Sequence, residues 1–479
     1  MDNVNLVLDT FAEYVFFAVP VAGTDLRLVV VWLIVAAVFF TVWLGFPNLW
    51  GFKHAIDLVR GKFDHKGDPG EVSHFQALAT ALSGTVGLGN IAGVAVAITI
   101  GGPGATFWMI VAGLLGMALK MAECTLSTKY RHVHADGTIS GGPMYVMRDG
   151  LAAIRLGGLG KVLAVLFAVF AILGSLGGGN MFQSNQAAAQ IANVAGSDTE
   201  TLGLWVGLGF AVLVGLVIIG GIKSIASVTS KVVPAMAVVY LIACLVVILG
   251  NITAVPAAFG QIIGGAFNPD GVTGGIIGVL IMGFQRAAFS NEAGIGSAAI
   301  AHSAVKTDEP ASEGFVALLE PFIDTVVICT MTALTIIITG VWTTGGDDGV
   351  ALTSAAFESV LPWFPYVLAI CVVLFAFSTM LSWSYYGAKA TGYLFGDNRH
   401  AENVYKVLFC VFTVVGALGA SESILGFSDA AIFAMAVPNI LCLYLLSGDL
   451  RREVKGYWAR VVKGEGAPED DAEREVARV

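Results

Sequence analysis

Charged residues are scarce in this chain of 479 residues. Asp, Glu, Lys and Arg together make up only 13% of it, against roughly 25% in an ordinary soluble domain. A water-soluble globule of this size could not cover its surface with so few charges, so that class is excluded. High apolar content with a net charge of −10 also excludes a disordered chain and a nucleic-acid-binding protein.

Cysteine is sparse as well. The six cysteines are scattered, and all lie in apolar stretches, where a thiol behaves as a small hydrophobic group. This pattern excludes a disulfide-stapled secreted domain and indicates no metal site. Because no Lys or Arg precedes Arg27, we expect no cleavable signal peptide. The short apolar run 11–22 is expected to form a helix that lies on the membrane surface.

Apolar residues take the place of the missing charges. They form 56% of the chain, with a mean hydropathy of +0.81, and they cluster in runs of about 20 residues, the length that a helix needs to cross a bilayer. The composition therefore predicts an all-α polytopic membrane protein. Eleven spans are expected, at about 27–47, 74–99, 104–130, 161–193, 202–221, 231–250, 271–303, 312–341, 365–394, 402–420 and 426–447.

The basic residues indicate an orientation. Nearly all of the 25 Lys and Arg residues lie in every second connection or in the tail, and short cytoplasmic loops carry the positive excess. We therefore expect the N-terminus outside the cell and the tail in the cytoplasm, as a solvated or partly disordered end.

Two of the expected spans carry interruptions. The span 74–99 has three glycines within six residues, accompanied at bilayer depth by Ser83, Thr85 and Asn90. Each glycine costs roughly 1 kcal/mol of helix propensity, so we expect a broken helix; close helix packing on small residues is the alternative. In the span 271–303, five polar or charged residues fall within 285–292. Such residues are too costly to face lipid, so they face protein, water or a ligand.

The spacing of the two breaks is informative. They lie five spans apart, so the two broken helices cross in opposite senses, which is the signature of an inverted-repeat transporter. We expect a 5+5 core with one additional N-terminal transmembrane helix. The expected division is an extracytoplasmic or interfacial segment 1–26, the extra helix and a cytoplasmic loop 27–73, the first repeat 74–250, the second, inverted repeat 251–447 and a cytoplasmic tail 448–479.

Unwound backbone offers groups to ligands. The N-terminal end of the half-helix after the break is positive and suits a carboxylate, which predicts a carboxylate site at the amides from Gly87 to Asn90. Freed carbonyls suit a cation, which predicts a sodium site near Ser83, Thr85 and Val86.

Three stretches resemble the alanine/glycine:cation symporter family, bacterial and archaeal carriers that couple small amino acids to sodium. They are QALATALSGTVGLGNIAG at 76–93, GGPMY at 141–145 and NEAGIGS at 291–297, and the likeness covers nearly the whole chain. The resemblance implies a leucine-transporter-type fold, transport of alanine or glycine, and Na+ as the coupling ion.

The resemblance also implies site residues. It places the substrate contacts at Thr85, Gly89, Asn90, Gln183, Gln285, Phe289, Thr379 and Trp383. Trp383 lies one helical turn from the Thr379 hydroxyl, and its bulk would limit the substrate pocket to a methyl-sized side chain. The alternative is that Trp383 is an anchor at the membrane interface. For sodium, the implied ligands are the carbonyls of Ser83 and Val86 with the hydroxyls of Ser378 and Thr379. Such hydroxyls usually just bond the carbonyl one turn back.

Several charged residues at bilayer depth have no assigned role: Arg286, Glu292, Glu320 and Asp324. A structural network of ion pairs and a cytoplasmic gate or proton-coupling site are both open. Glu320 and Asp324 share a helix face and would repel unless a cation or Arg286 lies between them. Lys120 and Glu123 are expected to pair locally.

The sequence thus predicts a sodium-coupled symporter of small neutral amino acids, alanine or glycine, in the bacterial inner membrane. A proton-coupled amino-acid symporter of the same fold is the alternative. A membrane-embedded enzyme would need a catalytic cluster such as paired Asp or H-E-x-x-H, and none is visible in the sequence. An ion channel would need acidic rings along a pore.

Overall fold

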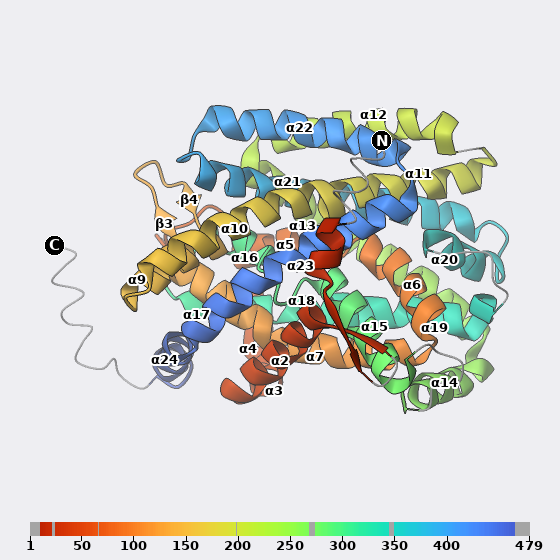
Figure 1. The fold of residues 1–479 in the computed structure, drawn as a ribbon, viewed down its shortest axis with the longest axis horizontal. Coiled ribbons are helices and arrows are strands. Elements are labelled where there is room, and N and C mark those ends of the chain that lie inside the picture. The colour runs from red at the N-terminus through yellow and green to blue at the C-terminus, as the bar shows by residue number, and fades with distance from the viewer. Residues whose placement is uncertain are drawn as a thin grey trace.

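The protein is a bundle of helices (Figure 1). The computed structural model describes residues 10–21, 24–65, 67–197, 199–267, 274–343 and 349–464. Within these ranges, β-sheet pairing is confined to two short antiparallel hairpins and one isolated bridge. The helices α12 (Thr199–Ile218) and α22 (Arg399–Leu418) lie side by side at one edge of the view, and α2 (Leu28–Trp43) lies near the opposite edge (Figure 1).

Eight helices of the described chain are long and apolar enough to cross a membrane, and a bent pair makes nine. The protein is therefore a multi-pass membrane protein. The eight are α7 (Gly104–Lys129), the run from α10 (Gly157–Leu176) through the π-helical η3 (Gly177–Met181) to α11 (Phe182–Ala195), α12, α13 (Gly221–Gly250), the run from α17 (Pro310–Ala317) through α18 (Leu319–Pro321) and η5 (Phe322–Cys329) to α19 (Thr330–Thr339), α21 (Phe364–Leu394), α22 and α23 (Ser421–Leu445).

Both expected helix breaks are confirmed. In the bent pair, α5 (His74–Thr85) and α6 (Ala92–Gly101) meet at 57° across the short 3-10 helix η1 (Leu88–Asn90). The second break separates α15 (Gly275–Asn291) from α16 (Ala298–His302). There the backbone of Glu292 is left-handed, with φ of 56°, as is that of Gly294, with φ of 92°. Two of the eleven expected spans are not among these nine. In the expected span 27–47, α2 has only 16 residues, which is shorter than a full span. The expected span 271–303 is divided by the second break into α15 and α16.

The N-terminal expectation is wrong in its second half. Residues 10–15 are helical, but β1 (Ala18–Val21) pairs antiparallel with β2 (Thr24–Arg27). Valine at 19 and 21 favours extended backbone, and Pro20 lacks the N–H that a helix interior uses. The chain therefore turns as a hairpin immediately before α2.

Two helices lie in connections that were expected between spans. They are α14 (Val255–Phe267) and α20 (Gly349–Glu358), which contact α7 and α6 respectively. Each is shorter than a span, so neither produces the apolar run of about 20 residues by which spans are recognised. Packing against a broken or long helix stabilises them instead.

The tail is also more ordered than expected. Residues after Gly448 continue α24 (Ser447–Tyr457) and the π-helical η7 (Trp458–Val462), which contact the bundle at α7 and α17. The acidic run expected at the end of the tail lies outside the described residues. The remaining elements are α3 (Pro47–Trp50), α4 (Phe52–Val59), β3 (His132–Val133), β4 (Ile139–Ser140), α8 (Pro143–Tyr145), η2 (Val146–Gly150), α9 (Leu151–Ala153), η4 (Ile252–Ala254) and η6 (Val341–Thr343).

Candidate functional site

The break between α5 and α6 redirects backbone donors to side chains. The N–H of Gly87 donates to Asn90 Oδ1 at 2.8 Å, and the N–H of Leu88 donates to Gln183 Oε1 at 3.2 Å. In a continuous helix these two amides would bond the carbonyls of Ser83 and Gly84. The break therefore frees those two carbonyls from their helical partners.

Glycine at position 87 permits a close approach by two other helices. A Cβ there would lie 2.5 Å from the hydroxyl oxygen of Thr379 on α21 and 3.2 Å from Gln183 Oε1 on α11. The Thr379 hydroxyl is buried and forms no hydrogen bond with the described residues. The structure thus brings Gly87, Gln183 and Thr379 together around an unpartnered polar atom.

Asp324 lies beside the same break. Its carboxylate accepts hydrogen bonds from Asn90 Nδ2 at 2.6 Å, from the Ser290 hydroxyl at 2.8 Å and from the Thr325 hydroxyl at 2.6 Å. It is fully buried and has no ion pair among the described residues. A buried carboxylate held only by neutral donors attracts a cation. The sequence showed Asp324 as a charge at bilayer depth, but not that its partner is Asn90.

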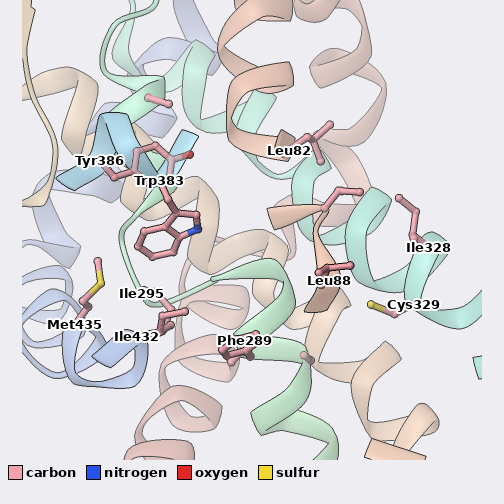
Figure 2. Close-up of a cluster of buried hydrophobic side chains, with 14 of the residues drawn as sticks. Leu82, Leu88, Phe289, Ile295, Ile328, Cys329, Trp383, Tyr386, Ile432 and Met435 are labelled. Atoms are coloured by element: carbon pink, nitrogen blue, oxygen red, sulfur yellow. The ribbon is translucent and has the colours of Figure 1, made fainter. Parts of the chain in front are cut away.

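Trp383 lies on α21, one helical turn after Thr379. It is 1% exposed, so it is not an interfacial anchor, and its Nε1 donates to Glu292 Oε1 at 3.0 Å. In Figure 2 its indole lies against Tyr386 from the same helix, with ring centroids 5.4 Å apart. Glu292, at the second helix break, therefore positions Trp383.

The backbone of η3 is pressed against this indole. A Cβ at Gly179 would lie 2.2 Å from Trp383 Cγ. We expect Gly179→Ala to lower the free energy of unfolding by about 1–3 kcal/mol, the usual cost of overpacking. Thermal unfolding in detergent measures this. Gly158→Ala is the control, because nothing lies within 4 Å of a Cβ at Gly158; equal midpoints for the two variants would contradict the packing argument.

The two candidates on α15, Gln285 and Phe289, lie in different places. Phe289 lies near the first break, since a Cβ at Gly89 would be 3.5 Å from its ring, and Figure 2 shows it close to Leu88. Gln285 does not join them: it accepts a hydrogen bond from Arg27 Nη1 at 2.6 Å and donates to Asp429. The structure therefore places Gln285 in a separate polar cluster with Arg27 of β2 and Asp429 of α23.

The candidate cation ligands lie where α5 meets α21. The Ser83 hydroxyl donates to the Ser378 carbonyl at 2.5 Å, while the Ser378 hydroxyl donates to the Phe375 carbonyl at 3.1 Å. The latter is the bond to the preceding turn that a membrane hydroxyl usually makes. Val86 leaves helical geometry, with ψ of 84°, and the Thr85 hydroxyl bonds weakly within α5 at 3.4 Å.

The structure excludes one alternative charge pairing and shows that one expected pairing is wrong. Arg286 pairs with Asp429 rather than lying between Glu320 and Asp324. Lys120 forms its ion pair with Glu320 at 3.5 Å, whereas Glu123 accepts a hydrogen bond from Asn439 at 2.7 Å. Glu123 lies on α7 with Lys120, whereas Glu320 lies on α18, so the Lys120–Glu320 pair depends on how α7 packs against α18.

A buried polar chain extends from Lys120. Glu320 faces one imidazole nitrogen of His302 at 2.5 Å, Glu313 faces the other at 2.5 Å, and His74 contacts Glu313 in turn. Cys124 lies with His302 and Glu320, their ligand atoms all within 4.8 Å of one another. Because both imidazole nitrogens already face carboxylates, this group is better suited to an ion-pair network than to a metal.

Comparisons with known proteins identify the family of the chain. A model of the sodium:alanine symporter family matches residues 14–472. The chain is 42% identical to the sodium/alanine symporter AgcS of Methanococcus maripaludis, over 88% of this chain and 92% of that protein. It is 34% identical to the amino-acid carrier protein AlsT of Bacillus subtilis, over 89% of this chain and 88% of that protein.

A solved structure shows the fold. The transporter MhsT, crystallised with L-phenylalanine, superposes with a TM-score of 0.58 at 15% sequence identity, covering 81% of this chain and 93% of MhsT. The fold is thus of the leucine-transporter type, as the resemblance implied. The family is one of transporters, not of enzymes. With a matching model over nearly its whole length and a relative at 42% identity, the chain belongs to the sodium:alanine symporter family.

Proposed function

We propose that the protein carries small neutral amino acids, alanine or glycine, into the cell together with sodium by alternating access. The observation that carries this proposal is the α5–α6 break, where two backbone amides, an unpartnered hydroxyl and a carboxylate converge. Amides and a hydroxyl suit the substrate carboxylate, and the carboxylate of Asp324 suits a cation.

The substrate carboxylate would replace side-chain oxygens at the break. The amides of Gly87 and Leu88 currently donate to the amide oxygens of Asn90 and Gln183, which are acceptors of the kind that a carboxylate supplies. A charged acceptor forms hydrogen bonds roughly twice as strong as a neutral one. The Thr379 hydroxyl would add a further donor.

Sodium would bind at the same crossing. The Ser83 hydroxyl donates to the Ser378 carbonyl, and Gly87, which follows Val86, lies close to the Thr379 hydroxyl. The carbonyls of Ser83 and Val86 with the hydroxyls of Ser378 and Thr379 would form the first candidate site. Asp324 and Asn90 form the second. Each positive charge carried inward gains about 2.3 kcal/mol per 100 mV, which corresponds to roughly 50-fold accumulation at 1.36 kcal/mol per decade.

Trp383 would set the size limit of the substrate. We expect Trp383→Ala to admit amino acids larger than alanine, because removing the indole opens space beside Thr379. Competition of labelled alanine uptake by leucine and phenylalanine measures this. Trp363→Ala is the control, since that indole is 54% exposed. An unchanged substrate range in Trp383→Ala would remove this residue from the pocket.

The arrangement across the membrane is part of the proposal. We infer eleven spans, with inverted repeats at 74–250 and 251–447, in a bacterial inner membrane with the N-terminus outside and the C-terminus inside. Its support is the alternation of basic connections together with a break in the first expected span of each repeat. A C-terminal reporter that is active only in the periplasm should stay silent; activity there would reverse the orientation.

Reconstitution tests the coupling. Purified protein in proteoliposomes should accumulate labelled alanine when sodium is added outside at constant pH. Uptake that ignores sodium but follows a proton gradient would favour the proton-coupled alternative. A panel of competing D- and L-amino acids would define the substrate within the class of small neutral amino acids.

A further inference from the structure

A cavity outside the transport site lies between the end of α2 and the tail helix α24. Its volume is about 510 Å³. Three indoles line it, from Trp43 at the end of α2, Trp50 of α3 and Trp458 of η7, and three cations line it, Arg451, Lys455 and Lys463. No acidic residue is among its lining residues in the described chain. The cavity is therefore both aromatic and strongly cationic.

The acidic residues of α24 are engaged elsewhere. Asp449 accepts from Lys129 at 3.0 Å, and Glu453 lies 2.9 Å from the same ammonium group. Within the described ranges, Arg451 and Lys455 form no ion pair with any carboxylate; the Arg451 guanidinium instead lies 4.6 Å from the centre of the Trp43 ring. Arg451 and Lys455 are thus available to an anion.

Apolar surface leads away from the cavity along α2. Val35, Val38 and Val42 are 51%, 44% and 60% exposed on this membrane helix, and Val42 itself lines the cavity. Indoles gather where a membrane meets water. A ligand that fits here carries a negative charge at the cavity and apolar chains along the valines.

We propose that this cavity binds the phosphate headgroup of an anionic phospholipid, with Arg451 and Lys455 as its cationic partners and the acyl chains along Val35, Val38 and Val42. Free phosphate offers the same charge without the apolar contacts, so the apolar surface favours the lipid. Under the orientation proposed above, the lipid belongs to the cytoplasmic leaflet, but the binding itself does not depend on that orientation.

A lipid bound in this cavity would be linked to the helix bundle through aromatic contacts between the lining indoles and α17. Trp50 and Trp458 both contact the Phe315 ring on α17, each with centroids 5.4 Å apart. The same helix carries Glu313 of the buried ion chain. Occupancy of the cavity is therefore expected to stabilise the contact between the tail helix and α17.

The test measures binding of a fluorescent phosphatidylglycerol to protein in neutral detergent. We expect binding to wild type, with negligible competition by phosphatidylcholine or by inorganic phosphate at the same concentration. Arg451→Gln combined with Lys455→Gln should weaken binding about 30-fold, since each cation contributes about 1 kcal/mol near a charged surface. The matched control, Arg399→Gln with Arg452→Gln, removes two cations that are 86% and 78% exposed, and it should bind as wild type does.

Three results would overturn the proposal. Equal loss in both double variants would indicate unspecific charge attraction, and full binding by the Arg451/Lys455 variant would exclude these residues. Equal competition by inorganic phosphate would assign the cavity to a free anion. Gel filtration checks folding; if the double variant is misfolded, the single variants Arg451→Gln and Lys455→Gln test the same contacts, each with about a 5-fold loss expected.

Discussion

Replacing Asp324 with Asn is expected to abolish alanine uptake at the sodium concentrations that saturate the wild type. The carboxylate is buried, accepts from three neutral donors beside the α5–α6 break, and has no ion-pair partner in the described parts of the chain. If sodium is its partner during transport, removing the charge costs about 3–5 kcal/mol, as breaking a buried pair does. The sodium concentration for half-maximal uptake should therefore rise by more than 100-fold.

The substitution keeps the shape of the side chain, so it separates charge from packing. Flux into proteoliposomes at increasing sodium gives the apparent affinity, and a thermal midpoint near that of wild type shows that the fold survives. Asp25→Asn is the control, because that carboxylate is exposed on the hairpin before α2. Wild-type sodium dependence in Asp324→Asn would exclude Asp324 as a cation ligand.

Gly87→Ala is expected to have the second large effect, loss of alanine binding. The new methyl group would lie 2.5 Å from the Thr379 hydroxyl and 3.2 Å from Gln183 Oε1. It would push α21 and α11 away from the two amides that we assign to the substrate carboxylate. A displacement of about 1 Å at a ligand site costs on the order of 100-fold in activity. Equilibrium binding of labelled alanine to purified protein measures the loss.

The matched control is Gly93→Ala, six residues along the same broken helix. Nothing lies within 4 Å of a Cβ at Gly93, so that variant should bind and transport alanine as wild type does. Equal loss in both variants would point to a general need for flexible backbone rather than to a site at Gly87. Normal binding by Gly87→Ala would place the carboxylate elsewhere.

Much of the fold could be predicted because the bilayer imposes a simple rule. A helix must hide its own backbone polar groups and present about 20 apolar residues, so long spans are visible as runs. Glycines and polar residues at bilayer depth violate that rule. The run at 83–90 coincides with the α5–α6 break, and the run at 285–292 ends where α15 ends and the second break begins. The helices α14 and α20 were not predicted, because helices this short do not produce a run of about 20 apolar residues.

The partners of the polar side chains could not be predicted in this way. Asn90 donates a hydrogen bond to Asp324, which is 234 positions away in the sequence, and Trp383 donates one to Glu292, which is 91 positions away. Gln285 is bound by Arg27, 258 positions away, and so does not lie at the α5–α6 break. Lys120 likewise forms its ion pair with Glu320 rather than with its sequence neighbour Glu123.

By itself, then, the sequence determined the membrane class, the places where backbone is released and the family resemblance, because these depend on composition and short-range pattern. Only the tertiary structure decided which side chains surround the released backbone, since hydrogen bonds and ion pairs between distant helices depend on how the helices pack.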